Sequence, residues 1–338
     1  KVLELFSGIG GMHYALKDAG LKFDVVAALD ISEVPNRVYR HNFPDVPHSA
    51  KNICGLTAKQ WQQWGVEAVL MSPPCQPFTR QGNQKDVQDP RSQPLLHLLT
   101  ILPQVPTLKY ILLENVKGFE ESEARSKLIQ TLKSMQFHWQ EFLISPTDLG
   151  IPNSRLRYYL IGQSSQLSFQ FPTRAEIWTD LSSLQKVSRQ TQNPAKLESF
   201  LETSPCCTTK LSDAMLLRYA EVMDIVNAKS ERSCCFTKSY GRYVEGTGSI
   251  LQQSGDLDTV YQRFRALPKE KEAERVAILK ELDLRFFTPE EISRLMGFPE
   301  EFEFPPESTQ LHRFRALGNS LNVKVVSFLL DLLIKSSD

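Results

Sequence analysis

Short apolar runs alternate with amphipathic stretches over residues 1–165, and this alternation constrains the fold most strongly. The apolar runs are KVLELF, DVVAALD, VEAVLM and YILLEN. Between and after them lie four stretches of helical periodicity: Met12 to Ala19, Pro35 to Asn42, Pro94 to Val105, and Ala124 to Met135. Strands that alternate with helices predict βαβ units, and nearly continuous apolar strands indicate helices on both faces. We therefore expect an α/β fold with a doubly wound, mostly parallel sheet.

The rest of the chain divides into a second, smaller region and a C-terminal segment that should rejoin the domain formed by the N-terminal part. HWQEFLIS and RLRYYLIG predict a hairpin at the sheet edge, after which the sequence becomes rich in Ser, Gln and Thr until a charged helical stretch, Lys269 to Asp283. Thr288 then begins a helix with a capping box, and an apolar helix from Leu321 to Ile334 should pack on the N-terminal sheet. We expect one domain of residues 1–175 and 288–338, and a smaller region of residues 176–287.

Composition excludes several classes of protein. The 39 basic and 39 acidic side chains give no global basic field, so a nucleic-acid partner would have to be held by local patches. The longest apolar stretch, Val325 to Ile334, is interrupted by Asp331 and is shorter than the ~20 residues of a membrane span. The six cysteines form no C-x-x-C pair, so no metal site is expected. The N-terminus has no signal-peptide pattern, which favours an intracellular protein.

A glycine-rich turn, FSGIGGM, follows the first expected strand, and Asp30 ends the second. At the carboxyl edge of such a sheet, glycines admit a ligand close to the backbone and an acid accepts ribose hydroxyl groups. The dinucleotide pattern G-x-G-x-x-G fails because His13 occupies its third glycine position. A cofactor without phosphates, S-adenosylmethionine, fits better than a dinucleotide. A merely structural tight turn is the alternative.

Two reactive side chains are expected at the same edge of the sheet. Cys75 follows VEAVLM within SPPCQPF, where prolines stiffen the loop and present the thiol to the cleft. The polar stretch after it, TRQGNQKDVQDPRS, has the composition of a lid. Glu114 ends YILLE and either acts on a ligand or caps a helix. Arg155 and Arg157 share a face if they lie in one strand, and could orient a carbonyl or phosphate unless they form a solvated edge.

These motifs together resemble the cytosine-5 methyltransferase family. FSGIGG, PPCQPF, ENV, SRLR, the GFP at Gly297 to Pro299 and the terminal GNS have the family's order and spacing over nearly the whole chain. The match is closest to the subfamily named as the second eukaryotic DNA-methyltransferase homologue, which modifies tRNA. That similarity rests on Met12, ENVKGF, the stretch from Asp148 to Arg155, and Cys235-Phe236-Thr237. Asp148 stands where the subfamily pattern has Ser, a departure away from the catalytic motifs.

The resemblance implies a class I S-adenosylmethionine-dependent methyltransferase whose smaller region recognises the target. Cys75 would attack C6 of cytosine, Glu114 and Arg155 would stabilise charge on the ring, and Arg157 would support the loop. No metal is required, and S-adenosylhomocysteine is the product. The residues implied to bind the cofactor are Phe6, Ile9, Gly10, Gly11, Asp30, Ile53, Cys54, Ser72, Asn319 and Ser320.

The polymer that carries the cytosine is the remaining question. Lys229, Arg232, Lys238 and Arg242 form a local basic excess interleaved with Phe236, Tyr240 and Tyr243, a pattern typical of phosphate and stacking contacts or of a solvated loop. The residues expected to contact substrate are Lys238, Arg242, Cys235, Phe236 and Thr237. With the resemblance, we expect a tRNA substrate, namely cytosine 38 in the anticodon loop of aspartate tRNA, weaker DNA binding, no membrane partner, and a cytoplasmic and nuclear location.

Two alternatives stay open at this point. A DNA cytosine-5 methyltransferase would use identical chemistry, since neither Cys75 nor Glu114 distinguishes the polymers. A catalytically silent nucleic-acid-binding module is the other alternative, and intact Cys75, Glu114 and Arg155 argue against it.

Overall fold

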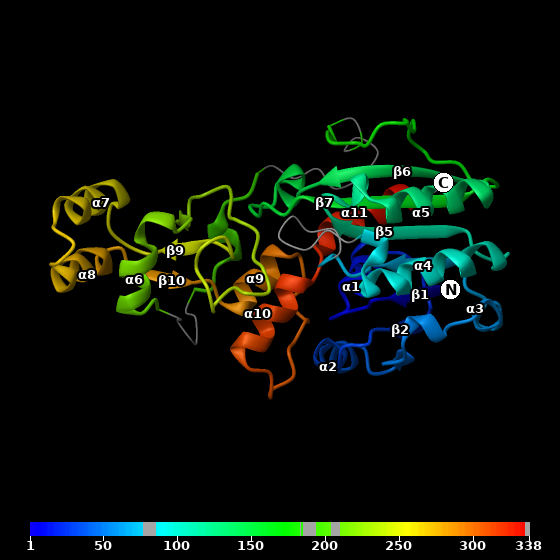
Figure 1. Cartoon of the computed structure of the whole chain (residues 1–338), viewed down its shortest axis with the longest axis horizontal. Coiled ribbons are helices and arrows are strands. Elements are labelled where there is room, and N and C mark those ends of the chain that lie inside the picture. Colours follow the sequence, from blue (N-terminus) through cyan, green and yellow to red (C-terminus); the bar gives the residue numbers. More distant parts are fainter. Residues whose placement is uncertain (77–85, 183, 185–193, 204–209, 335–338) are drawn as a thin grey trace.

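The computed structural model of the chain has two lobes, joined through α9 (Pro289–Leu295) and α10 (Gln310–Asn319) (Figure 1). It describes residues 1–76, 86–182, 184, 194–203 and 210–334. The first part of the expected lid, together with Pro77, Phe78, Cys206 and Cys207, lies outside these described residues.

A seven-stranded sheet of order β3-β2-β1-β4-β5-β7-β6 forms the larger lobe. Its strands are β1 (Val2–Leu5), β2 (Val25–Leu29), β3 (His48–Ser49), β4 (Ala68–Met71), β5 (Tyr110–Val116), β6 (Phe137–Ile144) and β7 (Arg157–Ser164). The strands from β3 to β5 run parallel, whereas β7 is antiparallel to both β5 and β6. The expected sheet and its edge hairpin are confirmed, and the two-residue β3 was not predicted.

Helices cover both faces of this sheet. They are α1 (Gly11–Asp18), α2 (Glu33–Asn42), α3 (Ala58–Trp64), α4 (Gln93–Ile101), α5 (Glu123–Ser134) and α11 (Val323–Ile334). Alternate strand residues divide between two apolar clusters: Leu70 and Leu112 pack in one, Val69 and Ile111 in the other. This division follows from the two-residue period of a strand and confirms a doubly wound sheet.

The last helix, α11, packs against α1, β5 and β7, as expected for an apolar C-terminal helix. The stretch Gln310–Ile334 is long and apolar enough by length and composition to cross a membrane, but 72% of its most apolar window is buried inside the protein. Its first part is a separate helix, α10 (Gln310–Asn319). Such burial is typical of a core helix.

The smaller lobe holds a three-stranded sheet of order β10-β9-β8 and three helices. Its elements are β8 (Ile225–Val226), β9 (Ile250–Gln252), β10 (Leu284–Phe286), α6 (Asp213–Tyr219), α7 (Leu257–Ala266) and α8 (Glu272–Lys280). Helix α8 matches the charged helical stretch. Just past the boundary expected at residue 175, Trp178 still exchanges two backbone hydrogen bonds with β6, at Glu141 and Leu143.

A buried ion pair joins β10 to α9 (Pro289–Leu295), where the chain returns to the larger lobe. Both terminal guanidinium nitrogens of Arg285 donate to the carboxylate of Glu291 at 2.7 Å, and the side chains are 2% and 0% exposed. The same carboxylate accepts from the backbone N–H of Thr288, which completes the predicted capping box. One carboxylate therefore fixes the connection between the lobes.

We expect Glu291→Ala to lower the free energy of unfolding by about 3–5 kcal/mol, because it leaves Arg285 buried without its counter-ion. Glu290→Ala is the matched control on the same helix, since Glu290 pairs with Arg313 at a partly exposed site and should cost less than about 1 kcal/mol. Denaturant unfolding of both variants measures the difference. Equal losses would contradict this role for the buried pair.

Candidate active site

The glycine loop turns from β1 into α1 through a strained backbone. Phe6 has a φ of 56°, unusual for a residue with a side chain, and Gly10 has a φ of 90°. A Cβ on Gly10 would lie 2.5 Å from the Phe43 ring, and one on Gly11 would lie 2.9 Å from Leu321. Glycine is thus required at Gly10, where φ is positive, whereas a side chain at Gly11 would need Leu321 to move; at both positions the chain can pass close to whatever binds beyond the strand ends.

Asp30 lies beside this loop at the end of β2. Its carboxylate accepts from the backbone N–H of Gly8 at 3.0 Å and of Ser32 at 2.8 Å. Burial raises the pKa of Asp30, and these two hydrogen bonds only partly offset the effect. The next residue, Ile31, is 70% exposed and was not singled out from the sequence. In the sequence, an apolar residue directly after the acid that ends an expected strand is the signal that could have marked Ile31 as a candidate site residue.

The other residues expected to hold a cofactor lie around the same edge. Ser72 Oγ donates to the carbonyl of Phe6 at 3.1 Å, and Ser320 Oγ would lie 3.3 Å from a Cβ on Gly11. Ile9 and Ile53 are buried, whereas Cys54 and Asn319 are exposed.

These residues fit an adenosine-type ligand. Ser7 Oγ in the loop is buried without a hydrogen-bond partner among the described residues, and the Asp30 carboxylate stands on the neighbouring strand. Within the same described residues, no group of three or more His, Cys, Asp or Glu side chains is arranged to hold a metal ion.

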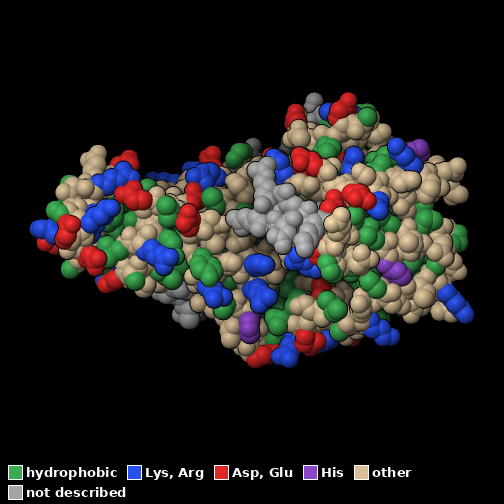
Figure 2. Space-filling view, in the orientation of Figure 1, with side chains coloured by type: hydrophobic (Ala, Val, Ile, Leu, Met, Phe, Trp, Pro, Cys, Tyr) green, Lys and Arg blue, Asp and Glu red, His purple; other side chains and the backbone are tan. Residues whose placement is uncertain are grey.

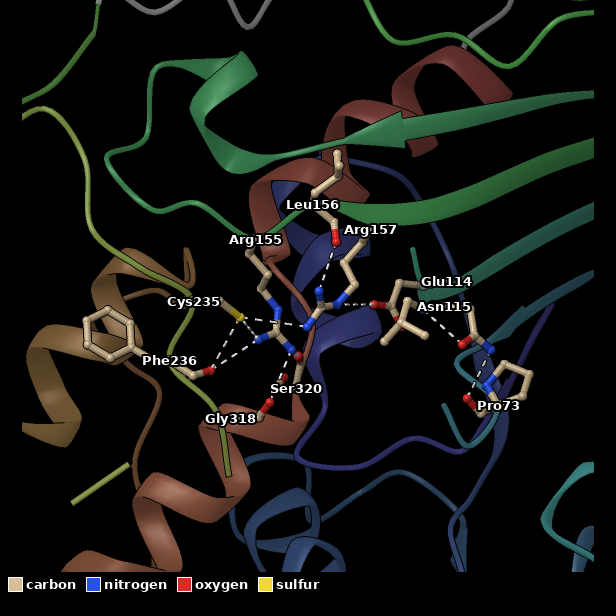
Figure 3. Close-up of polar contacts among 11 residues, drawn as sticks. Pro73, Glu114, Asn115, Arg155, Leu156, Arg157, Cys235, Phe236, Gly318 and Ser320 are labelled. Atoms are coloured by element: carbon tan, nitrogen blue, oxygen red, sulfur yellow. Dashed lines mark hydrogen bonds and ion pairs between the residues drawn. The ribbon is translucent and has the colours of Figure 1, made fainter. Parts of the chain in front are cut away.

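Cys75 follows β4, and Glu114 lies near the carboxyl end of the neighbouring parallel strand β5. The side-chain amide of Asn115 donates to the carbonyl of Pro73 at 3.3 Å, which ties the cysteine loop to the end of β5 (Figure 3). Asn115 is 1% exposed and had no assigned role in the sequence. Its position directly after Glu114 means that one strand end fixes both the loop and the carboxylate.

Burial dominates the electrostatics of these two groups. It raises the pKa of the Glu114 carboxyl against the opposing effect of Arg157 and Arg155. Burial also raises the pKa of the Cys75 thiol, the Glu114 charge adds to this increase, and the two arginines oppose it. Arg157 is the nearer counter-ion, with Nε 3.7 Å from Glu114 Oε1. Burial therefore shifts the pKa of both groups in the direction of the neutral form, and the two arginines act against that shift.

Arg155 and Arg157 differ in their surroundings, which corrects the roles expected for them. Strand β7 begins at Arg157, so Arg155 precedes it and strand periodicity does not place both on one face. Arg155 is 4% exposed and donates to the backbone carbonyls of Phe236, Gly318 and Ser320. Arg157 contacts Glu114 instead. Arg155 is the supporting residue, and Arg157 faces the reactive groups (Figure 3).

Cys235 lies between the two arginines rather than at an exposed surface. Its Sγ accepts from Arg155 Nη1 at 3.3 Å and from Arg157 Nη2 at 3.8 Å. Burial raises the pKa of this thiol, but the two guanidinium charges more than offset it, so the net pKa is lowered. Buried Asn153, which the sequence did not single out, donates to Ser233 Oγ and to the Cys234 carbonyl, both at 3.1 Å, and anchors this segment.

The structure corrects several of the expected substrate contacts. Phe236 and Tyr240 are 2% and 1% exposed and pack on each other, so the expectation that their rings stack on a substrate is wrong. The backbone N–H of Thr237 donates to the Thr247 carbonyl at 2.8 Å, so this N–H is already used within the loop. Lys238 and Arg242 are exposed, as a phosphate contact requires.

An ion pair also reduces the local excess of positive charge that the sequence predicts in the smaller lobe. Arg232 pairs with Asp224 at 3.0 Å, so this cation is already partly neutralised. Figure 2 shows Lys and Arg mixed with Asp and Glu over the smaller lobe, and further Lys and Arg near α10, where the lobes meet.

We expect Glu114→Gln to shift the alkylation of Cys75 by iodoacetamide to lower pH, because a carboxylate that raises the thiol pKa is replaced by a neutral amide. The shift applies above the pKa of Glu114, where the wild-type carboxylate is ionised. Mass spectrometry of the Cys75 peptide across a pH series measures it, with the exposed Cys54 as internal control. An unchanged or higher midpoint would contradict this arrangement.

Arg155→Ala should destabilise the protein by about 3 kcal/mol or more, because it removes charged hydrogen bonds and leaves several buried carbonyls without donors. Arg157→Ala should have a smaller effect on unfolding and instead raise the pKa of Cys75, since an opposing positive charge is lost. Thermal unfolding separates the two, and the same alkylation assay measures the rise in the Cys75 pKa, to which loss of either arginine contributes. A similar melting temperature for both variants would refute the difference in roles.

Comparison with known proteins places these motifs in a family. Residues 1–335 match the family described as C-5 cytosine-specific DNA methylase. A rat protein named tRNA (cytosine(38)-C(5))-methyltransferase is 45% identical over 98% of both chains. A solved structure of a Spodoptera frugiperda DNMT2 triple mutant has a TM-score of 0.88 and 44% identity over 99% of both chains. A Dictyostelium discoideum protein named DNA (cytosine-5)-methyltransferase is 37% identical over 100% of this chain and 95% of its own.

Proposed function

The chain belongs to the C-5 cytosine-specific DNA methylase family, and we propose that it methylates C5 of cytosine 38 in tRNA, with aspartate tRNA as a substrate. The observation that carries the chemistry is the convergence of Cys75, Glu114 and Arg157 at the ends of β4, β5 and β7, beside the glycine loop. Relatives named for cytosine 38 of tRNA, similar over nearly their whole length, support the polymer and the position. The resemblance of the sequence to the tRNA-modifying subfamily supports aspartate tRNA.

Cytosine C5 is a weak nucleophile, and the proposed residues address this weakness. The Cys75 thiolate adds to C6, which breaks the aromaticity of the ring and makes C5 enamine-like. Negative charge then develops toward N3 and O2, where a protonated Glu114 donates a hydrogen bond and Arg157 supplies positive charge. The raised pKa of Glu114 suits a donor. After transfer, the C5 proton is removed and Cys75 leaves, which restores the aromatic ring.

S-adenosylmethionine supplies the methyl group. The backbone from Phe6 to Gly11 would hold it, with Asp30 toward the ribose hydroxyl groups and Ile53 and Cys54 near the adenine; Ile31, exposed directly after Asp30, offers a further apolar contact. Ser320, which lies against Gly11, would close the site from the α10 side.

The target base must leave its stack to reach Cys75, because this thiol is only partly exposed after β4 at the sheet edge. Bases in an RNA loop already splay outward, whereas a duplex must be unpaired first. A DNA cytosine-5 methyltransferase is the second candidate, favoured by the Dictyostelium relative's name and by identical chemistry. The relatives named for tRNA are more similar to this chain than the Dictyostelium protein is, which favours the tRNA proposal.

The decisive experiment incubates the protein with radiolabelled S-adenosylmethionine and aspartate tRNA that carries 5-fluorocytosine at position 38. Because fluorine replaces the C5 proton, Cys75 cannot be expelled, so a complex resistant to denaturation should accumulate. Cys75→Ala should form no complex and lose transfer to ordinary tRNA, while Cys234→Ala, a free cysteine outside the proposed machinery, should behave as wild type. Calorimetry should find cofactor binding by Cys75→Ala nearly unchanged.

Competition with duplex DNA of equal phosphate content tests the polymer. Aspartate tRNA should compete far better than DNA, because the unpaired loop presents its cytosine without duplex opening. Comparable methylation of the duplex would favour the DNA alternative, and transfer by Cys75→Ala at wild-type levels would refute the covalent step.

A further inference from the structure

One exposed aromatic side chain stands on a tightly specified loop beside the catalytic centre. Tyr243 is 48% exposed, whereas Phe236 and Tyr240 in the same loop are buried. The Arg242 guanidinium lies 5.4 Å from the centroid of the Tyr243 ring. An aromatic face next to an exposed arginine is the combination that proteins use to stack unpaired nucleotides.

The loop of residues 235–247 is held in one conformation by close packing. Gly241 has a φ of 79°, and a Cβ there would lie 2.6 Å from the Phe314 ring of α10. The Tyr240 hydroxyl donates to the Ser249 carbonyl at 2.7 Å and accepts from the Phe287 N–H at 2.9 Å. The Tyr243 carbonyl accepts from Thr247 Oγ1 at 2.7 Å. An aromatic ring on so fixed a backbone binds with little loss of conformational entropy.

The same loop leads directly to the reactive groups. It begins at Cys235, which contacts both arginines, and its Thr237 backbone packs on Gly318, whose carbonyl accepts from Arg155. The loop contacts α10 at Gly318 and again at Phe314, and these two residues are about one helical turn, ~5.4 Å, apart. Tyr243 lies two residues beyond the contact at Phe314. A nucleotide that neighbours a base bound at Cys75 could therefore reach its ring.

We propose that Tyr243, with Arg242 beside it, is a stacking platform for an unpaired nucleotide next to the target cytosine. This inference rests on the proposed tRNA function. The ring takes the base, and Arg242 and the exposed Lys238 take the adjoining phosphates. Glu245 is the one acidic residue of the loop, so cations predominate there.

The test compares Tyr243→Phe, Tyr243→Trp and Tyr243→Leu in steady-state methylation of tRNA. Phe and Trp keep an aromatic face and should keep the KM. Leu keeps an apolar side chain without a π-face and should raise the KM about 5- to 100-fold with little change in kcat, as loss of one stacked base does. Val222→Ala is the control, because Val222 is 47% exposed in the same lobe and distant in sequence from the loop.

A second measurement separates stacking from loop structure. A 2-aminopurine placed immediately 5′ or 3′ of the target, one position at a time, should be quenched in complexes with wild type and Tyr243→Phe but not with Tyr243→Leu. An unchanged KM for Tyr243→Leu, or an equal rise for Tyr243→Phe, would overturn the platform while leaving tRNA methylation intact. Failure of the wild-type protein to methylate tRNA would instead refute the proposed function, and the platform with it.

Discussion

The buried guanidinium of Arg155 is the contact on which the geometry of the site depends. Its nitrogens donate to carbonyls of the smaller lobe at Phe236 and of the turn between α10 and α11 at Gly318 and Ser320. A buried charge is tolerated when its donors find acceptors, and these carbonyls accept from both terminal nitrogens of Arg155, while its Nε has no partner among the described residues. Arg155 therefore holds together the entry to β7, the smaller lobe and the turn behind the glycine loop.

Burial has opposite consequences for the two reactive groups that this framework positions. A raised pKa suits Glu114, because a neutral carboxyl group can donate a hydrogen bond to a ring nitrogen. The same burial disfavours the Cys75 thiolate that the proposed covalent step requires, and ionised Glu114 would disfavour it further. Arg157 acts on both groups: its charge favours the Cys75 thiolate, but it also opposes the raised pKa that suits Glu114. The proposed reaction thus depends on a neutral Glu114 and a charged Arg157 side by side.

The sequence predicted what regular patterns encode. Cys75 and Glu114 follow apolar strands of a parallel sheet, so their meeting at one edge follows from topology. Arg155 and Phe236 were misjudged for a different reason: a two-residue period cannot locate the first residue of β7, and an aromatic in a polar stretch gives no sign that it is buried. The strands of the smaller lobe have only two or three residues, too few to produce a periodic signal.

The contact between α10 and the loop of residues 235–247 explains how recognition and chemistry can share one surface. A Cβ on Gly318 would lie 2.2 Å from the Thr237 carbonyl carbon, so the two backbones touch with no side chain between them. Packing this close leaves little room for independent movement. Any displacement of the loop by a bound polymer would act on Cys235 and, through it, on both arginines. Because Arg157 also contacts Glu114, occupancy of the exposed loop and the electrostatics of the reactive groups are joined by an unbroken series of contacts.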